Sequence, residues 1–240
     1  MVLGLYYITK LRKGAKGEGL TFYGPEEALI AYNEGKVDIH AIVNVVVKDL
    51  DKDGKIVDVM MKETSVGRVI VNEIVPAEVG YLNTIISKKS LRDIISDVIK
   101  AVGVARACEF LDGIKNLGYY MAFKGGLSFN LGDIIIPKEK EELVKRGNEE
   151  VEQIMMNYNM GFITDNERYN QVIDTWTHVN SDLSDILYKT IKNDDQGFNS
   201  VFMMLDSGAR GSKEQIRQLS GMRGLMAKPQ KAGAEGAQII

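Results

Sequence analysis

The strongest constraint on the fold is a charged segment, residues 138–192, in which apolar residues recur at helical spacing. In its second part the apolar positions stand 3, 4, 3, 4 and 3 residues apart: Tyr169, Val172, Trp176, Val179, Leu183 and Ile186. This is the heptad spacing that aligns one face of an α-helix with another helix. Its first part carries a stripe of Val144, Val151, Met155 and Tyr158, Gly161 indicates a turn, and Thr164 with Glu167 forms a capping box. The sequence therefore predicts a long antiparallel helical hairpin with a seam at Tyr169, Val172, Trp176, Val179 and Leu183.

Charge is distributed unevenly along the chain. The whole sequence has 30 Lys and Arg against 33 Asp and Glu, so it is not a general polyanion binder. Residues 137–192 hold seven basic and eleven acidic residues, whereas residues 207–240 hold six basic and two acidic ones. A hairpin that is polar outside is typical of a protein-docking or channel-wall element. The basic tail is the place to look for an anion.

Composition is that of a soluble chain with a real core: 45% of its 240 residues are hydrophobic and 26% are charged. No run approaches the roughly 18 apolar residues that a membrane helix needs, so we expect no membrane contact. Cys108 is the single cysteine, which excludes an intrachain disulfide and fits a reducing compartment, the cytoplasm by default. Both ends stand at apolar segments, from which we expect a fragment of a longer protein.

The first half of the chain mixes helices and strands. Helices are predicted over residues 2–12 and Pro25–Asn33, and β-branched residues predict a β-hairpin from residues 38–48 and 56–59. Residues 64–74 are ambiguous between helix and strand. A helical pattern covers Ser90–Val102, and a second helix should follow Gly103. The predicted class is α+β, mostly helical, with a small α/β region, a helical hairpin and a Gly/Arg-rich loop-helix tail.

Candidate metal and nucleophilic residues each favour a structural interpretation. Asp49, Asp51 and Asp53 alternate as in a calcium loop, but the position of its bidentate Glu is Met60, so a hairpin turn is favoured. Cys108 lies in an apolar helical pattern with Ala107, Leu111, Ile114 and Leu117, and we expect it to be buried. The two histidines, His40 and His178, lack a Cys or His at ligand spacing, so no metal site is predicted.

The basic tail leaves two interpretations open. Gly208, Gly211, Gly221 and Gly224 alternate with basic residues, so that cationic side chains and exposed backbone donors are offered together, as an anion site requires. The alternative is a solvated basic loop.

Two stretches of this tail, Phe198–Ser212 and Gln215–Pro229, closely resemble the segment of the bacterial RNA polymerase beta-prime family that leads into its bridge helix. Shorter matches to the same family follow in the same order along the chain: Gly4–Thr9, Lys16–Gly19, Thr64–Arg68 and Glu167–Asn170. The resemblance therefore covers essentially the whole sequence.

The resemblance implies three regions and a set of functional residues. It implies a pore region over residues 1–136, a funnel with the rim helices of the secondary channel over 137–197, and the start of the cleft region with the F-loop over 198–240. The rim would line the route of nucleoside triphosphates and receive transcript-cleavage factors. Arg210, Asn199 and Met204 would lie near the substrate, and the implied F-loop residues are Gln215, Arg217, Gln218, Arg223 and Met226.

The resemblance also implies partners and a cofactor. Mg²⁺ would act in the whole enzyme, on the family's Asn-Ala-Asp-Phe-Asp-Gly-Asp loop, which precedes the Gly-Leu-Tyr-Tyr segment and is absent here. No catalytic or metal-binding residue is therefore expected in this chain, which would be inert alone. The implied partners are the beta, alpha and omega subunits, the remainder of beta-prime, nucleoside triphosphates, DNA and RNA. The competing hypothesis is a stand-alone helical-hairpin module that docks a partner protein, against which the composition of the tail argues.

Overall fold

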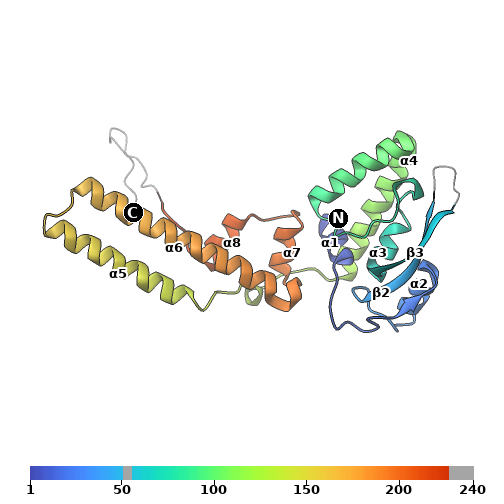
Figure 1. Cartoon of the computed structure of the whole chain (residues 1–240), viewed down its shortest axis with the longest axis horizontal. Helices are drawn as coiled ribbons and strands as arrows, with labels where there is room; N and C mark the ends of the chain where they lie inside the picture. The colour runs from blue at the N-terminus through green and yellow to red at the C-terminus, as the bar shows by residue number, and fades with distance from the viewer. Residues whose placement is uncertain (51–55, 227–240) are drawn as a thin grey trace. The chain divides into compact units, whose positions relative to one another are not determined.

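The computed structural model describes residues 1–50 and 56–226, with the backbone alone at 48–50 and 56–60. Asp51, Asp53, Lys228 and Lys231 lie outside the described residues. The described chain divides into two compact units: residues 1–129 with 202–210, and residues 130–201 with 211–226. Figure 1 labels their elements, which confirm a mostly helical α+β class.

The first unit contains a small three-stranded sheet beside helices α1 (Val2–Thr9) and α2 (Pro25–Asn33). Its strands are β1 (Thr21–Phe22), β2 (Ile42–Leu50) and β3 (Ile56–Ser65), in the order β1-β2-β3. Strand β1 pairs with β2 in parallel, and β2 pairs with β3 in the predicted antiparallel hairpin. The helix predicted over 2–12 ends at Thr9, because Lys10 is already extended, at φ −78° and ψ 141°.

Residues 64–74, ambiguous in sequence, divide between a strand and a helix. Ser65 ends β3 and caps α3 (Val66–Asn72), since its hydroxyl accepts a hydrogen bond from the Arg68 amide at 3.2 Å. A short 3₁₀ turn, η1 (Ala77–Val79), leads to α4 (Lys88–Lys124). Helix α4 is two helical segments joined at Gly103, whose φ of 77° interrupts the helix at the predicted position.

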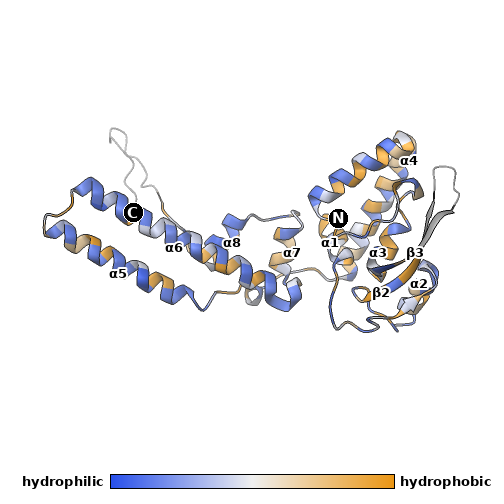
Figure 2. Cartoon of the chain, viewed as in Figure 1, coloured by the Kyte–Doolittle hydropathy of each residue, from blue (hydrophilic) through white to orange (hydrophobic). Residues whose placement is uncertain are grey.

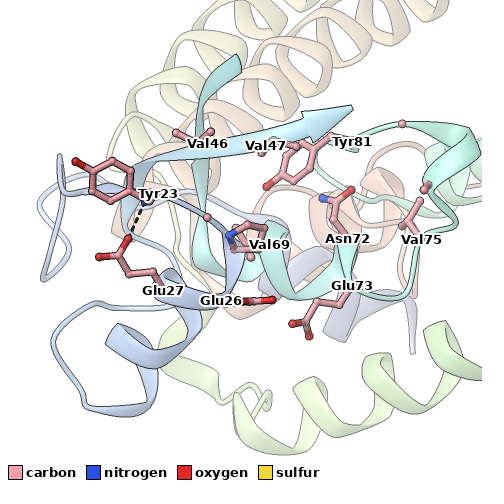
Figure 3. A pocket seen from close by; sticks show the side chains of 14 residues that line it. Tyr23, Glu26, Glu27, Val46, Val47, Val69, Asn72, Glu73, Val75 and Tyr81 are labelled. Carbon is pink, nitrogen blue, oxygen red and sulfur yellow. Dashed lines mark hydrogen bonds between the residues drawn. The ribbon is translucent and has the colours of Figure 1, made fainter. Parts of the chain in front are cut away.

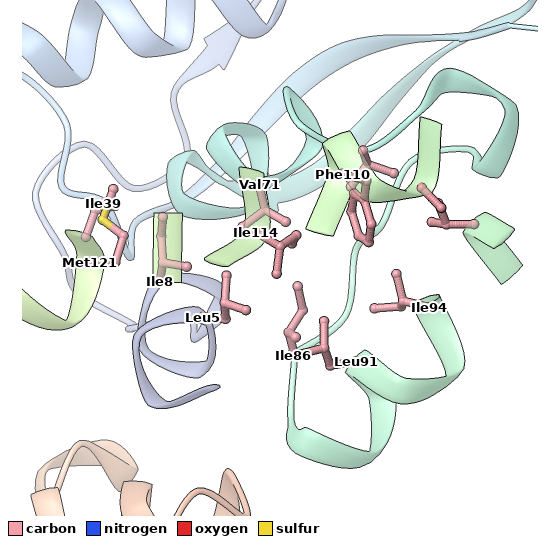
Figure 4. Packing of buried hydrophobic residues seen from close by; sticks show 13 residues of the cluster. Leu5, Ile8, Ile39, Val71, Ile86, Leu91, Ile94, Phe110, Ile114 and Met121 are labelled. Atoms are coloured by element: carbon pink, nitrogen blue, oxygen red, sulfur yellow. The ribbon is translucent and has the colours of Figure 1, made fainter. Parts of the chain in front are cut away.

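The main hydrophobic core of this unit lies between α1, α3 and the two halves of α4 (Figure 4). Leu5, Ile86 and Ile114 are among its fully buried side chains. The prediction for Cys108 was wrong, because Cys108 is exposed. After the break at Gly103, the helix turns Ala107, Phe110 and Ile114 toward the core, which leaves Cys108 on the outer side.

Helix α1 touches its neighbours backbone to backbone. A Cβ atom added to Gly4 would lie 2.0 Å from the carbonyl oxygen of Gly118 in α4, and one added to Gly67 in α3 would lie 1.9 Å from that of Ile8. These distances leave no room for a side chain. Glycine therefore sets the separation of the three helices.

The second unit is built on the predicted hairpin, α5 (Lys140–Asn159) and α6 (Asp165–Asn193). Thr164 caps α6 through the predicted capping box with Glu167. The unit also contains short 3₁₀ turns, η2 (Leu131–Asp133) and η3 (Asp194–Gly197), and α8 (Lys213–Ser220), which packs on α6. Figure 2 shows that α5 and α6 are mainly hydrophilic, with hydrophobic residues interspersed along each helix. Helix α7 (Ser200–Asp206) links the units in sequence.

His40, only 4% exposed, lies where the chain passes from α1 to the sheet. Its Nδ1–H donates to the Lys10 carbonyl oxygen at 2.9 Å, and its ring meets the Tyr7 ring edge to face at 4.5 Å between centroids. Burial lowers the pKa of His40 below its usual 6.5; Asp38 opposes this shift, and the charges of Arg12 and Lys10 add to it.

This pKa shift predicts a loss of stability in mild acid. The unfolded chain protonates His40 below about pH 6.5, whereas the folded chain resists protonation. The contribution of His40 to the stability of the fold is therefore complete above about pH 6.5. It is lost as the pH falls toward the lowered pKa of His40 in the folded chain. We expect the midpoint temperature of thermal unfolding to decrease when the pH is lowered from 7.5 to 5.5. The decrease should be smaller in His40→Gln. His178→Gln, which changes an exposed histidine, should behave like the parent chain; an equal fall in all three would contradict the assignment.

Candidate functional site

Arg210 and Met204, two of the residues singled out by sequence, lie at the end of α7 and in the loop that follows it, Ser207–Gly211. The loop is held by its own backbone. The Gly208 amide donates to the Leu205 carbonyl at 3.0 Å, and the Arg210 amide donates to the Met204 carbonyl at 3.3 Å. Ser207 is fully buried, and its hydroxyl donates to the same Met204 carbonyl at 3.2 Å. Arg210 itself is exposed, so an ordered turn presents its guanidinium to solvent.

Two elements of the first unit hold this turn from outside it. The Tyr6 hydroxyl, on α1, donates to Asp206 Oδ2 at 2.7 Å. The Lys88 amide, at the start of α4, donates to the Ser207 carbonyl at 2.8 Å. Gly208 adopts φ 71°, and a Cβ there would lie 3.3 Å from Lys88 Cβ. Residues 207–210 of the turn therefore belong to the first unit, although the hairpin lies between them and residues 1–129 in the sequence.

Asn199 has a different setting. It belongs to the second unit and is 5% exposed. Its Nδ2 donates to the Asp133 carbonyl at 3.0 Å and to Asp194 Oδ2 at 2.9 Å, and its Oδ1 accepts from the Val201 amide at 3.0 Å. Both donor hydrogens are used within the protein. Met204 is half-buried, and its carbonyl serves the turn described above.

Two of the predicted F-loop residues have structural bonds in α8. The Gln215 side chain accepts from the Ser212 amide at 3.0 Å and completes a capping box at the start of the helix. Arg217 joins α8 to the hairpin: it pairs with Glu214, and its Nη1 donates to Asn180 Oδ1, on α6, at 2.5 Å. With its side chain only 13% exposed, Arg217 is a bridge between helices.

The remaining F-loop residues face solvent. Gln218 and Arg223 are exposed, and Met226 is 42% exposed. Leu219, also on α8, is 68% exposed. Of the predicted tail, Gln218, Arg223 and Met226 thus remain accessible to a ligand or another chain.

The hairpin seam is buried along only part of its length. Tyr169, Val172 and Trp176 are half-buried, whereas Val179 and Leu183 are buried. Beyond Leu183 the buried positions are Leu187 and Ile191, with Ile186 half-buried. A straight helix of 3.6 residues per turn drifts from a strict heptad, which explains the change of position.

Gly147 marks the point where α5 approaches α6. It is buried, and a Cβ there would lie 3.1 Å from Val179 Cγ2 and 3.2 Å from Trp176 Cζ3. Toward the turn between the helices, apolar residues are exposed: Met156 by 57%, Met160 by 60% and Phe162 by 74%. The hairpin thus packs at its base and presents an apolar tip.

A separate cleft of about 560 Å³ lies in the first unit, between the start of α2 and the segment from α3 to Tyr81 (Figure 3). Val46, Val47 and Val69 are among its apolar lining residues. At its rim, Glu27 accepts a hydrogen bond from the Tyr23 amide at 2.7 Å. None of the predicted site residues lines this cleft.

Among residues 1–50 and 56–226, no three His, Cys, Asp or Glu side chains come together as a metal site. Within the same part of the chain, no helix is both long and apolar enough to cross a membrane.

Comparison with known proteins identifies the family. The family described as RNA polymerase Rpb1, domain 3, matches residues 1–134, and that described as RNA polymerase Rpb1, domain 4, matches residues 163–238. The chain therefore belongs to the RNA polymerase beta'/Rpb1 family, which confirms the resemblance seen in sequence.

The relatives are bacterial. The chain is 87% identical over 240 residues to the DNA-directed RNA polymerase subunit beta' of Bacteroides fragilis strain YCH46, and 85% identical to that of Bacteroides thetaiotaomicron. It is 54% identical over 245 residues to the corresponding subunit of Flavobacterium johnsoniae. All of this chain is covered in each comparison, but it spans only 17% of the length of each of these relatives.

Sequence reasoning missed part of this arrangement. A helix in the tail was predicted without bounds, and the capping box Ser212-x-x-Gln215 could have fixed where α8 begins. Tyr6 and Asp206 carried no such signal, because their contact joins residues 200 positions apart.

The burial pattern of the hairpin predicts an order of stability effects. Leu183→Ala removes a fully buried side chain and should lower the free energy of unfolding by about 3 kcal/mol or more. Trp176→Ala should cost less, about 2 kcal/mol, because Trp176 is half-buried. Asp182→Ala should lower the free energy of unfolding by about 0.5 kcal/mol or less. Asp182 is exposed, and its Oδ2 makes only a long, solvent-exposed ion pair with Arg146 Nη2, at 3.9 Å. Urea unfolding followed by circular dichroism measures all three; a larger effect at Trp176 than at Leu183 would contradict this packing.

Proposed function

We propose that this chain is the part of the catalytic subunit of DNA-directed RNA polymerase that forms the wall of the secondary channel and backs the active centre in transcription. In this proposal residues 1–136 form the pore region, residues 137–197 the funnel with its rim helices, and residues 198–240 the start of the cleft region. Membership of the beta'/Rpb1 family supports it. The observation that carries it is the ordered turn Ser207–Gly211 with its exposed arginine.

We propose the hairpin as the rim of the channel and as the docking site of transcript-cleavage factors. Its outer faces are charged and its packed base joins α8, so it can project as a rigid element. The exposed Met156, Met160 and Phe162 at the tip offer an apolar surface to a partner protein.

The other partners follow from the same proposal. They are the beta, alpha and omega subunits, the remainder of beta-prime, and DNA and RNA in the assembled enzyme. Mg²⁺ would act in the whole enzyme on residues outside this chain, where metal ions stabilise the attacking and leaving oxygens of nucleotidyl transfer.

Arg210 is the proposed contact to the incoming nucleoside triphosphate. A guanidinium presents a planar fork of donors that fits phosphate oxygens. The turn fixes its backbone, Gly208 and Gly211 on either side have no side chains, and Arg210 is exposed. The resemblance to the family also implies Asn199 and Met204 near the substrate. Because the Asn199 amide donates only within the protein, we propose that Asn199 orders the segment before α7.

The alternative, a stand-alone interaction module, also has an exposed hairpin tip. It gives no reason for the ordered arginine turn, and it does not explain identity to beta' subunits along the whole chain, from residue 1 to residue 240.

The purified chain should not incorporate nucleotides on any template with Mg²⁺, because none of its sequence matches the family's metal-binding loop. The measurement is template-dependent incorporation of labelled nucleotide, with the complete polymerase as the positive control. Incorporation by this chain, free of contaminating polymerase, would contradict the proposed division of roles.

Arg210→Ala in a reconstituted polymerase should lower the apparent efficiency of nucleotide addition about 10- to 150-fold, corresponding to a charge-assisted hydrogen bond of roughly 1.5–3 kcal/mol. Arg210→Lys should recover only part of the loss, because the fork of donors is missing. The measurement is elongation rate against triphosphate concentration, with thermal stability in parallel.

Arg92→Ala serves as the control for this experiment, since Arg92 is an exposed arginine on α4. It should leave substrate dependence unchanged. If Arg210→Ala impaired assembly and left the concentration for half-maximal elongation unaltered, Arg210 would be a structural arginine.

A further inference from the structure

We propose that Tyr6 and Lys10, on and just after α1, are positioning residues that hold the turn Ser207–Gly211 and thereby aim Arg210. The effect on substrate rests on the proposed function of Arg210. The effect on the turn itself does not, and the two can be measured separately.

The contact is built from buried groups. Tyr6 is 1% exposed and Lys10 is 7% exposed. The Tyr6 hydroxyl donates to Asp206 Oδ2 at 2.7 Å, and the Lys10 ammonium donates to the same hydroxyl at 3.3 Å. Asp206 is the last residue of α7, directly before the turn. A buried phenol thus ties the end of α7 to α1.

The charged groups of this contact lie on opposite sides of the Tyr6 hydroxyl. The cation of Lys10 lies at one side of the phenol and the carboxylate of Asp206 at the other, so the hydrogen bond from Lys10 polarises the O–H that Tyr6 donates. The Lys10 ammonium also lies 5.2 Å from the Tyr6 ring centroid and 5.1 Å from that of Phe202, on α7. Lys10 therefore fixes both Tyr6 and α7.

A second attachment, next to the Tyr6–Asp206 contact, fixes the orientation of the turn. The Lys88 amide holds the Ser207 carbonyl at 2.8 Å. One point of attachment would let the turn rotate about it, whereas two neighbouring points, Asp206 and Ser207, fix its orientation. The backbone bonds from Met204 to Arg210 then carry that orientation to the arginine.

Tyr6→Phe isolates the positioning role from a packing role. Phenylalanine keeps the buried ring and removes the hydroxyl alone. Asp206, which is exposed, can turn its carboxylate to water. The buried Lys10 ammonium loses the hydroxyl but stays 5.1 Å from the Phe202 ring centroid. The substitution should therefore loosen the turn while the core of the first unit stays intact.

The experiment uses reconstituted polymerase carrying Tyr6→Phe. The rate of amide hydrogen exchange in residues 204–211 should rise about tenfold, because one charge-assisted hydrogen bond that stabilises the turn is lost. Exchange along α4 should not change. The triphosphate concentration for half-maximal elongation should rise about three- to tenfold, with little change in the maximal rate. Asp206→Asn, which keeps an oxygen acceptor for the phenol, should show smaller changes of the same kind.

The matched control is Tyr119→Phe, which removes a hydroxyl from a tyrosine that is 63% exposed on α4. It should alter neither quantity. In an Arg210→Ala background, Tyr6→Phe should raise exchange in the turn as before but add no further change in substrate dependence, because both act through one side chain.

Unchanged exchange in residues 204–211 of Tyr6→Phe would overturn the positioning role, and so would additive effects on substrate dependence in the double variant. If Arg210→Ala alone left substrate dependence unaltered while Tyr6→Phe still raised exchange in the turn, the positioning role would stand and the substrate contact of Arg210 would fail.

Discussion

The close approach of α1 to α3 and α4 is the constraint on which the first unit depends. Gly4 and Gly67 allow backbone to meet backbone, and the neighbouring side chains Leu5, Tyr6 and Ile8 are then at most 1% exposed. A short helix buried this completely is fixed in position, so groups that it carries can orient distant parts of the chain. Tyr6 does so for the turn after α7, and the carbonyl of Lys10 does so for His40.

Periodicity and capping predicted the elements well, because those signals are local. The hairpin, the Thr164 cap and the break at Gly103 could all be read from neighbouring residues. Burial was predicted less well. The exposure of Cys108 depends on how α4 is rotated after Gly103, which the packing partners decide.

The candidate site divides in the same way. Arg210 could be singled out from its glycine neighbours and from family resemblance, but its support could not, because a hydroxyl on α1 and a carboxylate on α7 meet only in the folded chain. Arg217 shows the converse limit. Its place in a basic tail suggested an anion contact, whereas the fold pairs it with Glu214 and Asn180.

The contact between Tyr6 and Asp206 spans 200 residues, and this has a consequence for biosynthesis. At about 5–20 residues per second, a ribosome needs roughly 10–40 s to pass from one partner to the other. During that interval the nascent first unit lacks its last segment while the hairpin is already being made. The Tyr6 hydroxyl and Lys10 ammonium must meanwhile be served by water or by other groups, so the arginine turn is among the last parts of this unit to be completed.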